Sequence, residues 1–153
     1  MNSPPNILLM CGKFSTFTPK FTYISFKLME NFKDLVQKRR SVRKFTEQEI
    51  KAEDLQTILR AALMSPTSKG TRAWHFVVVD DPALLEKISL CRPMGSQFIA
   101  GAKVAVVVLG DREVTDAWCE DASLAAVTMQ YQAADLGLGS CWIQMRGRGL
   151  DDG

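Results

Sequence analysis

The stretch Val104-Ala105-Val106-Val107-Val108-Leu109 is a continuous run of apolar residues, bounded by Lys103 before it and by Gly110-Asp111 after it. A short run of this kind, rich in β-branched residues and without alternating polar side chains, is typical of a strand that is covered on both faces. The run therefore predicts a central strand in a sheet that is sandwiched between other elements.

Helices and a second strand are expected on the N-terminal side of that run. Apolar residues recur at helical spacing between residues 52 and 64, after the capping-box pattern Thr46-Glu47-Gln48-Glu49, and predict a helix there. Trp74–Val79 is rich in aromatic and β-branched residues and predicts a strand. Asp81-Pro82 predicts the start of another helix, because Asp is a favourable N-cap and Pro fits the first turn.

The sequence after the apolar run predicts the longest helix of the chain, from about Glu113 to Leu136, with Gly137 as its left-handed cap. Residues 139–144 are expected to enter a third strand. A helix of this length in a chain of 153 residues could also serve a dimer interface, and we expect a homodimer.

Composition restricts the class of protein. The 153 residues are 46% hydrophobic and 24% charged, which suits one domain, and a net charge of +2 disfavours general nucleic-acid binding. The four cysteines form no CxxC pair and the single histidine completes no metal site with them, so we expect reduced thiols, no metal and a cytoplasmic location. No apolar run is long enough to span a membrane.

The first 28 residues lack a sustained helical or strand period, whereas patterned sequence begins near Met29. We therefore expect a poorly ordered N-terminal extension over 1–28 and a domain over 29–153, with Met29 as an alternative translation start. No closing element follows residue 144, which predicts that the domain is incomplete at its C-terminus.

Residues Lys38-Arg39-Arg40-Ser41-Val42-Arg43-Lys44-Phe45 combine five positive charges with one hydroxyl. Three guanidinium groups and the serine could donate hydrogen bonds to one small anion, and a phosphate monoester would suit them. The segment lies between two apolar-patterned stretches, which favours a pocket. A solvated basic face and a nucleic-acid contact are the alternatives.

Two further segments are rich in polar or aromatic residues. The composition of Ser65-Pro66-Thr67-Ser68 predicts a loop, whose alternative interpretation is an ordinary helix-to-strand connection. Trp142 precedes Ile143 and Gln144, and its alternative interpretation is core packing. His75 is expected to be a hydrogen-bonded structural residue.

Three segments in this order resemble the FMN-dependent nitroreductase family: Arg39–Phe45, Ser65–Ser68 leading to Trp74-His75-Phe76, and Gly137–Trp142. The resemblance covers about residues 29–148 and implies an α+β fold, with a central mixed, mostly antiparallel sheet flanked by helices. In place of the Asn, Gln and Pro that many members have after the loop, this chain has Gly70, Arg72 and Ala73.

The resemblance also implies the contacts to the cofactor, FMN. The residues that it assigns to the FMN phosphate are Arg39, Arg40, Ser41 and Arg43. The residues that it assigns to the flavin ring and ribityl chain are Ser65, Pro66, Thr67 and Ser68, with Trp142, Ile143 and Gln144 near the isoalloxazine face. No side chain is assigned a catalytic role, because the hydride chemistry belongs to the flavin.

The function implied by the resemblance is an FMN-dependent oxidoreductase. It would pass two electrons from NAD(P)H through the flavin to a small flat acceptor, such as a nitroaromatic or a quinone, by a ping-pong mechanism. An inactive or non-enzymatic flavin-binding family member is the first alternative. A nucleic-acid-binding module that uses residues 38–44 is the more distant one.

Overall fold

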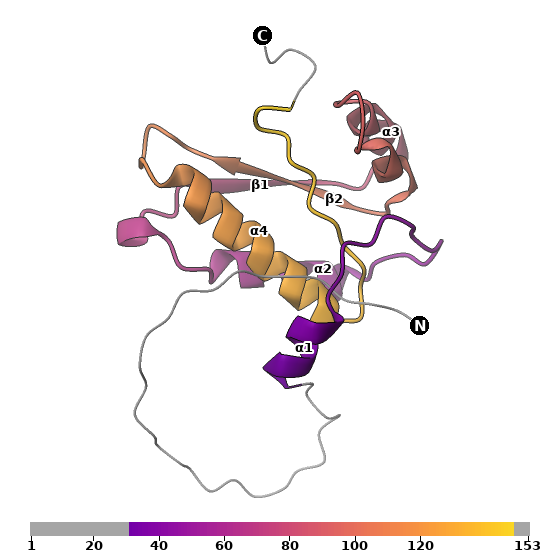
Figure 1. The fold of residues 1–153 in the computed structure, drawn as a ribbon, viewed down its shortest axis with the longest axis horizontal. Helices are drawn as coiled ribbons and strands as arrows, with labels where there is room; N and C mark the ends of the chain where they lie inside the picture. Colours follow the sequence, from indigo (N-terminus) through magenta and orange to yellow (C-terminus); the bar gives the residue numbers. More distant parts are fainter. Residues whose placement is uncertain (1–30, 149–153) are drawn as a thin grey trace, which may run out of the picture.

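The computed structural model describes residues 31–148, in which helices pack on both faces of a small antiparallel sheet (Figure 1). The expected extension over 1–28 lies outside the described residues. The elements, in chain order, are the helices α1 (Phe32–Lys38) and α2 (Ala52–Leu63), the 3-10 turn η1 (Ser68–Gly70), the strand β1 (Trp74–Val79), the helix α3 (Pro82–Ser89), the 3-10 turn η2 (Gln97–Gly101), the strand β2 (Ala105–Gly110) and the helix α4 (Trp118–Asp135). The expected α+β class is confirmed.

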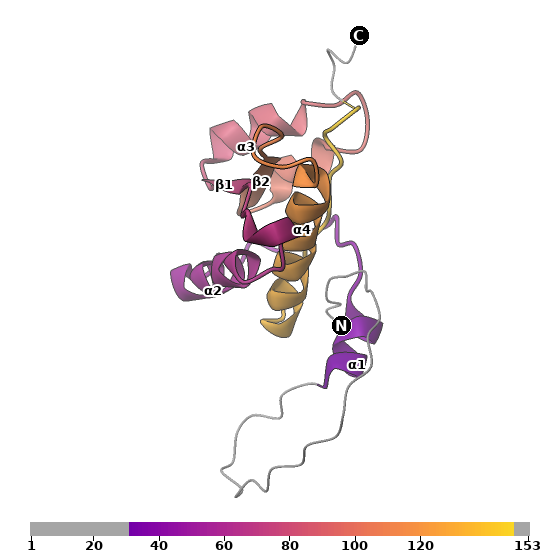
Figure 2. The ribbon, with the colours of Figure 1, turned by 90° about the vertical axis from the view of Figure 1, so that its left-hand side faces the viewer.

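The sheet pairs β1 with β2 in antiparallel register, from Trp74 opposite Gly110 to Val79 opposite Ala105. Successive side chains of a strand point to opposite faces, so the two strands supply two cores. Figure 2 shows α2 and α4 on one side of the sheet and α3 on the other. The prediction of helices on both sides of the sheet is therefore confirmed. The prediction of a central, covered strand is wrong within the described residues, because the sheet has two strands and β2 is only half-buried.

The larger core lies between the sheet and the pair α2 and α4. Ala62 of α2 and Ala125 of α4 are fully buried, and both belong to the same cluster as Trp74 and Met129. Small side chains let the two helices approach closely, which buries the apolar stripe of each helix against the strands. The second core joins Val79 to residues of α3 and η2.

The capping-box prediction for α2 is wrong. The helix begins at Ala52 with Lys51 as its N-cap, and no side chain caps it. Glu47 and Glu49 instead hold Lys103 at 3.2 and 2.9 Å. A long-range ion pair before β2 thus takes the carboxylates that the local pattern assigned to the helix end.

One helix boundary and one predicted strand also differ from the predictions. The helix α4 begins at Trp118 rather than near Glu113, because the backbone amide of Glu113 donates to Asp111 Oδ1 at 2.9 Å in a turn. Residues 139–144 form no strand within the described part of the chain and make one isolated parallel bridge, between Ser41 and Ser140. The caps at Asp81 and Gly137 are as predicted. No helix within 31–148 has both the length and the apolar character to cross a bilayer.

Candidate functional site

The basic segment begins at the C-terminal end of α1, where Arg39 is the C-cap residue and is only 6% exposed. Its Nε atom is buried and has no hydrogen-bond partner within residues 31–148. Burial lowers the pKa of the Arg39 guanidinium, the direction expected for a cation without a counter-charge. The neighbouring Arg40 is exposed and donates from Nη1 to the Arg39 carbonyl oxygen at 2.6 Å.

The next residues of this segment pair with the turn that follows α4. Ser41 and Ser140 form a parallel bridge, and the Val42 amide donates to the Ser140 carbonyl oxygen at 2.9 Å. Gly139 packs against Val42 so closely that an added Cβ would lie 3.0 Å from Val42 Cγ1. The structure therefore brings together two motifs that lie about a hundred residues apart in the sequence.

Gly139→Ala should destabilise the chain by about 1–3 kcal/mol, because the stiff β-branched Val42 side chain cannot give way to the new methyl group. Urea unfolding measures the change. Gly101→Ala is the matched control, since a Cβ there meets nothing within 4 Å. Adding Val42→Ala to the Gly139 variant should restore much of the loss, and an equal effect at both glycines would contradict this packing argument.

The chemistry at this junction fits a phosphate group. Arg39 Nε and Ser140 Oγ are both buried donors without a partner, and they lie on the two segments that the Ser41 bridge joins. An anionic oxygen is the acceptor that such donors lack. Arg43 is placed differently, with its guanidinium carbon 5.9 Å from the centroid of the Phe98 ring. The basic segment thus divides into a buried half at Arg39 and an exposed half at Arg43.

The end of the loop at Ser65–Ser68 is hydrogen-bonded to the buried carboxylate of Asp121. The Ser68 amide donates to Asp121 Oδ1 at 2.8 Å and the Thr71 hydroxyl lies 3.4 Å from Oδ2, while Asp121 is 2% exposed. Lys69 and Arg72 have φ values of 53° and 52°, a left-handed backbone that is uncommon outside glycine. The sequence prediction missed Asp121, because the helix predicted from Glu113 to Leu136 placed this acid in its interior, where a single Asp is usually an exposed polar residue.

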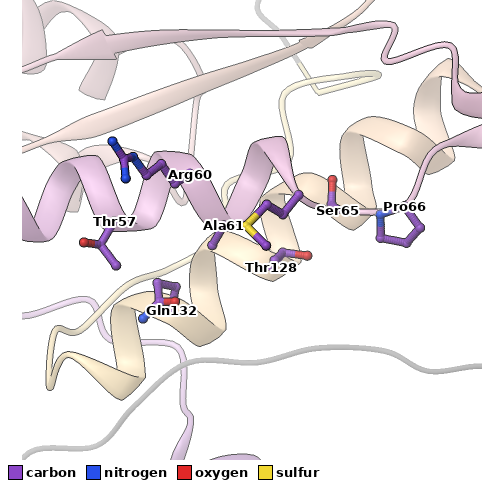
Figure 3. Close-up of a pocket in the computed structure, with 8 residues that line it drawn as sticks. Thr57, Arg60, Ala61, Ser65, Pro66, Thr128 and Gln132 are labelled. Carbon is purple, nitrogen blue, oxygen red and sulfur yellow. The ribbon is translucent and has the colours of Figure 1, made fainter.

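Ser65 and Pro66 also line a shallow, open surface pocket of about 360 Å³ between α2 and α4 (Figure 3). Its volume is at the lower end of the range for small-molecule pockets. In Figure 3, Thr57 and Arg60 lie at one end of the group and Ser65 and Pro66 at the other. The full lining comprises Thr57, Arg60, Ala61, Met64, Ser65, Pro66, Thr128 and Gln132. Six of these eight were not predicted as site residues, because they lie on helices without a polar motif.

In the third predicted segment, residues 142–144, the side chains of Trp142 and Gln144 contact each other and Ile143 packs against the sheet. Trp142 is 41% exposed, so it is not a core residue, and its Nε1 donates to Gln144 Oε1 at 3.0 Å. Ile143 packs against the second core, which contains Val79. The segment is thereby anchored on the sheet while the Trp142 indole stays accessible.

One chain does not bring all the predicted residues to one place. Ser68 is bound at Asp121, in the first turn of α4, whereas Ser140 follows the C-terminal end of α4, and α1, which leads into Arg39, packs beside that end (Figure 1). The 18 residues of α4 span about 27 Å at 1.5 Å per residue. The loop and the first half of the basic segment, at Arg39 and Ser41, therefore lie toward opposite ends of the longest helix.

Comparisons with known proteins agree with these motifs. The model of the nitroreductase family matches residues 36–92. The "Putative NADH dehydrogenase/NAD(P)H nitroreductase" of Archaeoglobus fulgidus is 34% identical over 119 residues, which are 75% of this chain and 68% of the relative. This chain thus spans about two thirds of that relative's length.

Solved structures have the same fold. An FMN-dependent nitroreductase from Clostridium difficile R20291 is 50% identical, with a TM-score of 0.75 over 77% of this chain and 69% of that one. A "putative nitroreductase in complex with FMN" from Desulfovibrio desulfuricans is 26% identical, with a TM-score of 0.68 over 76% of this chain and 69% of that one. The likeness therefore extends over most of the described residues.

Proposed function

Because the chain belongs to the nitroreductase family, we propose that it is an FMN-binding oxidoreductase that takes its electrons from NAD(P)H. When bound, FMN supplies two-electron transfer, first from NAD(P)H and then to a flat nitroaromatic or quinone acceptor in the same space, which gives ping-pong turnover. The observation that supports this proposal best is the buried, unpaired Arg39 beside the Ser41–Ser140 bridge.

The basic segment anchors the cofactor in this proposal. Arg39 offers its free Nε to the phosphate, and the exposed Ser41 adds a hydroxyl. Arg40 and Arg43 are exposed, so their side chains can reach a bound anion without disturbing the core. Charge-assisted hydrogen bonds of this kind give both affinity and orientation.

The loop at 65–68 and the segment at 142–144 contact the flavin ring in this proposal. The Thr67 hydroxyl, which accepts from the Arg72 amide at 3.3 Å, still has a proton to donate to a ring carbonyl or nitrogen. The pocket beside Ser65 and Pro66 offers apolar walls to a flat ring. The exposed Trp142 indole adds an aromatic face.

A homodimer would unite the two halves of the site, and we include it in the proposal. The loop and the first half of the basic segment lie toward opposite ends of α4, so one chain can offer its loop to the phosphate segment of its partner. The helix α1 has no buried residue and leaves Phe32 56% exposed, which provides apolar surface for such contact. Sedimentation velocity with and without FMN tests this assembly.

An absorbance spectrum of the purified chain, followed by anaerobic addition of NADH or NADPH, tests the function. A flavin band that bleaches with one of the two nucleotides and returns with a quinone is the expected result. A yellow protein that neither nucleotide bleaches would favour a non-enzymatic flavin-binding protein. A colourless protein that does not take up added FMN would overturn the proposal.

A further inference from the structure

Ser140 has a buried hydroxyl whose Oγ atom makes no hydrogen bond within the described residues. A buried polar group without a partner is rare in folded proteins and costs stability, so it requires an explanation. No hydroxyl is needed for the local fold, because the bridge to Ser41 and the bond from the Val42 amide use only backbone atoms of Ser140. The contacts of the local fold therefore do not explain why residue 140 carries a hydroxyl.

The position of Ser140 indicates what its partner would be. Residues that face each other across a parallel bridge point to the same side, so the hydroxyls of Ser140 and Ser41 lie on one side of the pair. Arg39, whose Nε is also buried and unpaired among the described residues, comes two residues before Ser41, which faces Ser140 across the bridge. A neutral donor and a cationic donor thus lie near one another, and both lack an acceptor.

Two other side-chain atoms are buried without a partner, Trp74 Nε1 and Arg92 Nε. Trp74 belongs to β1 in the larger core, and Arg92 follows α3. Neither of these residues belongs to the paired segments at 39–42 and 139–141. Among the described residues, only this junction contains both a basic side chain and a hydroxyl that are buried without a hydrogen-bond partner.

We propose that Ser140 is a further ligand of the FMN phosphate, donating its hydroxyl to the same phosphate group as Arg39 Nε. This inference rests on the proposed function and adds a residue that the basic motif does not contain. Both atoms are shielded from water in the ligand-free chain, so they reach a terminal phosphoryl oxygen by turning their side chains toward it, while the backbone bridge between the two segments stays in place. The hydroxyl consequently costs stability without the ligand and contributes affinity with it.

The test is Ser140→Ala in the full chain, measured in two ways. The dissociation constant for FMN should rise about tenfold, the loss expected for one hydrogen bond to a charged group, while the constant for riboflavin, which has no phosphate, should not change. The melting temperature of the ligand-free chain should rise by a few degrees, because the substitution removes an unsatisfied buried hydroxyl.

Ser96→Ala is the matched control, since the buried Ser96 hydroxyl donates to the Ser89 carbonyl oxygen at 2.7 Å. That variant should lower the melting temperature and leave the preference for FMN over riboflavin unchanged. If Ser140→Ala lowers the melting temperature as Ser96→Ala does, or weakens FMN and riboflavin equally, the hydroxyl is structural and the inference is overturned. Unchanged FMN affinity overturns it too.

A wild-type chain that binds no FMN would instead overturn the proposed function. Inorganic phosphate then decides the inference about Ser140. Phosphate should raise the melting temperature of the wild-type chain and not that of the Ser140→Ala variant. Equal stabilisation of both, or of neither, would show that Ser140 contacts no phosphate.

Discussion

Arg39→Met is expected to raise the dissociation constant for FMN roughly ten- to a hundredfold, the largest effect on binding of any single substitution in the basic segment. The variant removes charge-assisted hydrogen bonds worth about 1.5–3 kcal/mol to the phosphate. Met fills the buried space of the Arg39 stem, and the unpaired charge is lost, so the ligand-free chain should be as stable as the wild type or more so. Quenching of flavin fluorescence measures the affinity.

The matched control is Arg112→Met, because the Arg112 side chain is 80% exposed and pairs, within residues 31–148, with Glu113, whose side chain is 85% exposed. That variant should leave FMN affinity unchanged, since surface ion pairs contribute little. Wild-type affinity in Arg39→Met would remove Arg39 from the binding site. A large fall in the stability of the ligand-free variant would mean that Arg39 serves the fold instead.

Asp121→Ala is expected to cause the largest loss of stability, about 3 kcal/mol in the free energy of unfolding. The substitution leaves the Ser68 amide without its acceptor and removes the carboxylate next to the Thr71 hydroxyl. Hydrogen bonds to a charged group contribute about 1.5–3 kcal/mol each. A domain of this size should then melt roughly 10 °C lower, as circular dichroism would show.

Two variants separate the hydrogen bond of Asp121 to the Ser68 amide from the general effect of an acid in the first turn of α4. Asp121→Asn keeps an oxygen for the Ser68 amide and should recover about half of the loss. Glu120→Ala removes an exposed acid from the same helical turn and should be nearly neutral. The role assigned to Asp121 is contradicted if its Ala variant is no less stable than the Glu120 variant.

Much of the fold could be predicted from the sequence because its signals are local. The strand over Trp74–Val79 and the caps at Asp81 and Gly137 depend on propensities and turn chemistry within a few residues. The capping box at Thr46–Glu49 failed for the converse reason. Its acids bind Lys103, more than fifty residues away, and no local pattern reports such a partner.

The motifs of the candidate site could be predicted from the sequence, but the positions of their side chains relative to one another could not. The basic segment and the Ser65–Ser68 loop were found from their composition and from their resemblance to a family. The roles of Asp121 and Ser140 could not be found in this way, because a single acid or serine has many ordinary explanations. Only the 2% exposure of Asp121 and the unpaired Oγ of Ser140 distinguish them.

The sequence by itself determined the strand predicted over 104–109 and the chemistry available to bind a phosphate, because these depend on side-chain type and local periodicity, whereas the class of fold followed from the resemblance of its motifs to a known family. Only the tertiary structure decided which of those groups meet. Folding places Ser41 beside Ser140 and separates this pair from the loop at Ser68, which is bound at Asp121 in the first turn of α4. The physical reason is that contacts between distant residues depend on how whole helices and strands pack, which no short stretch of sequence specifies.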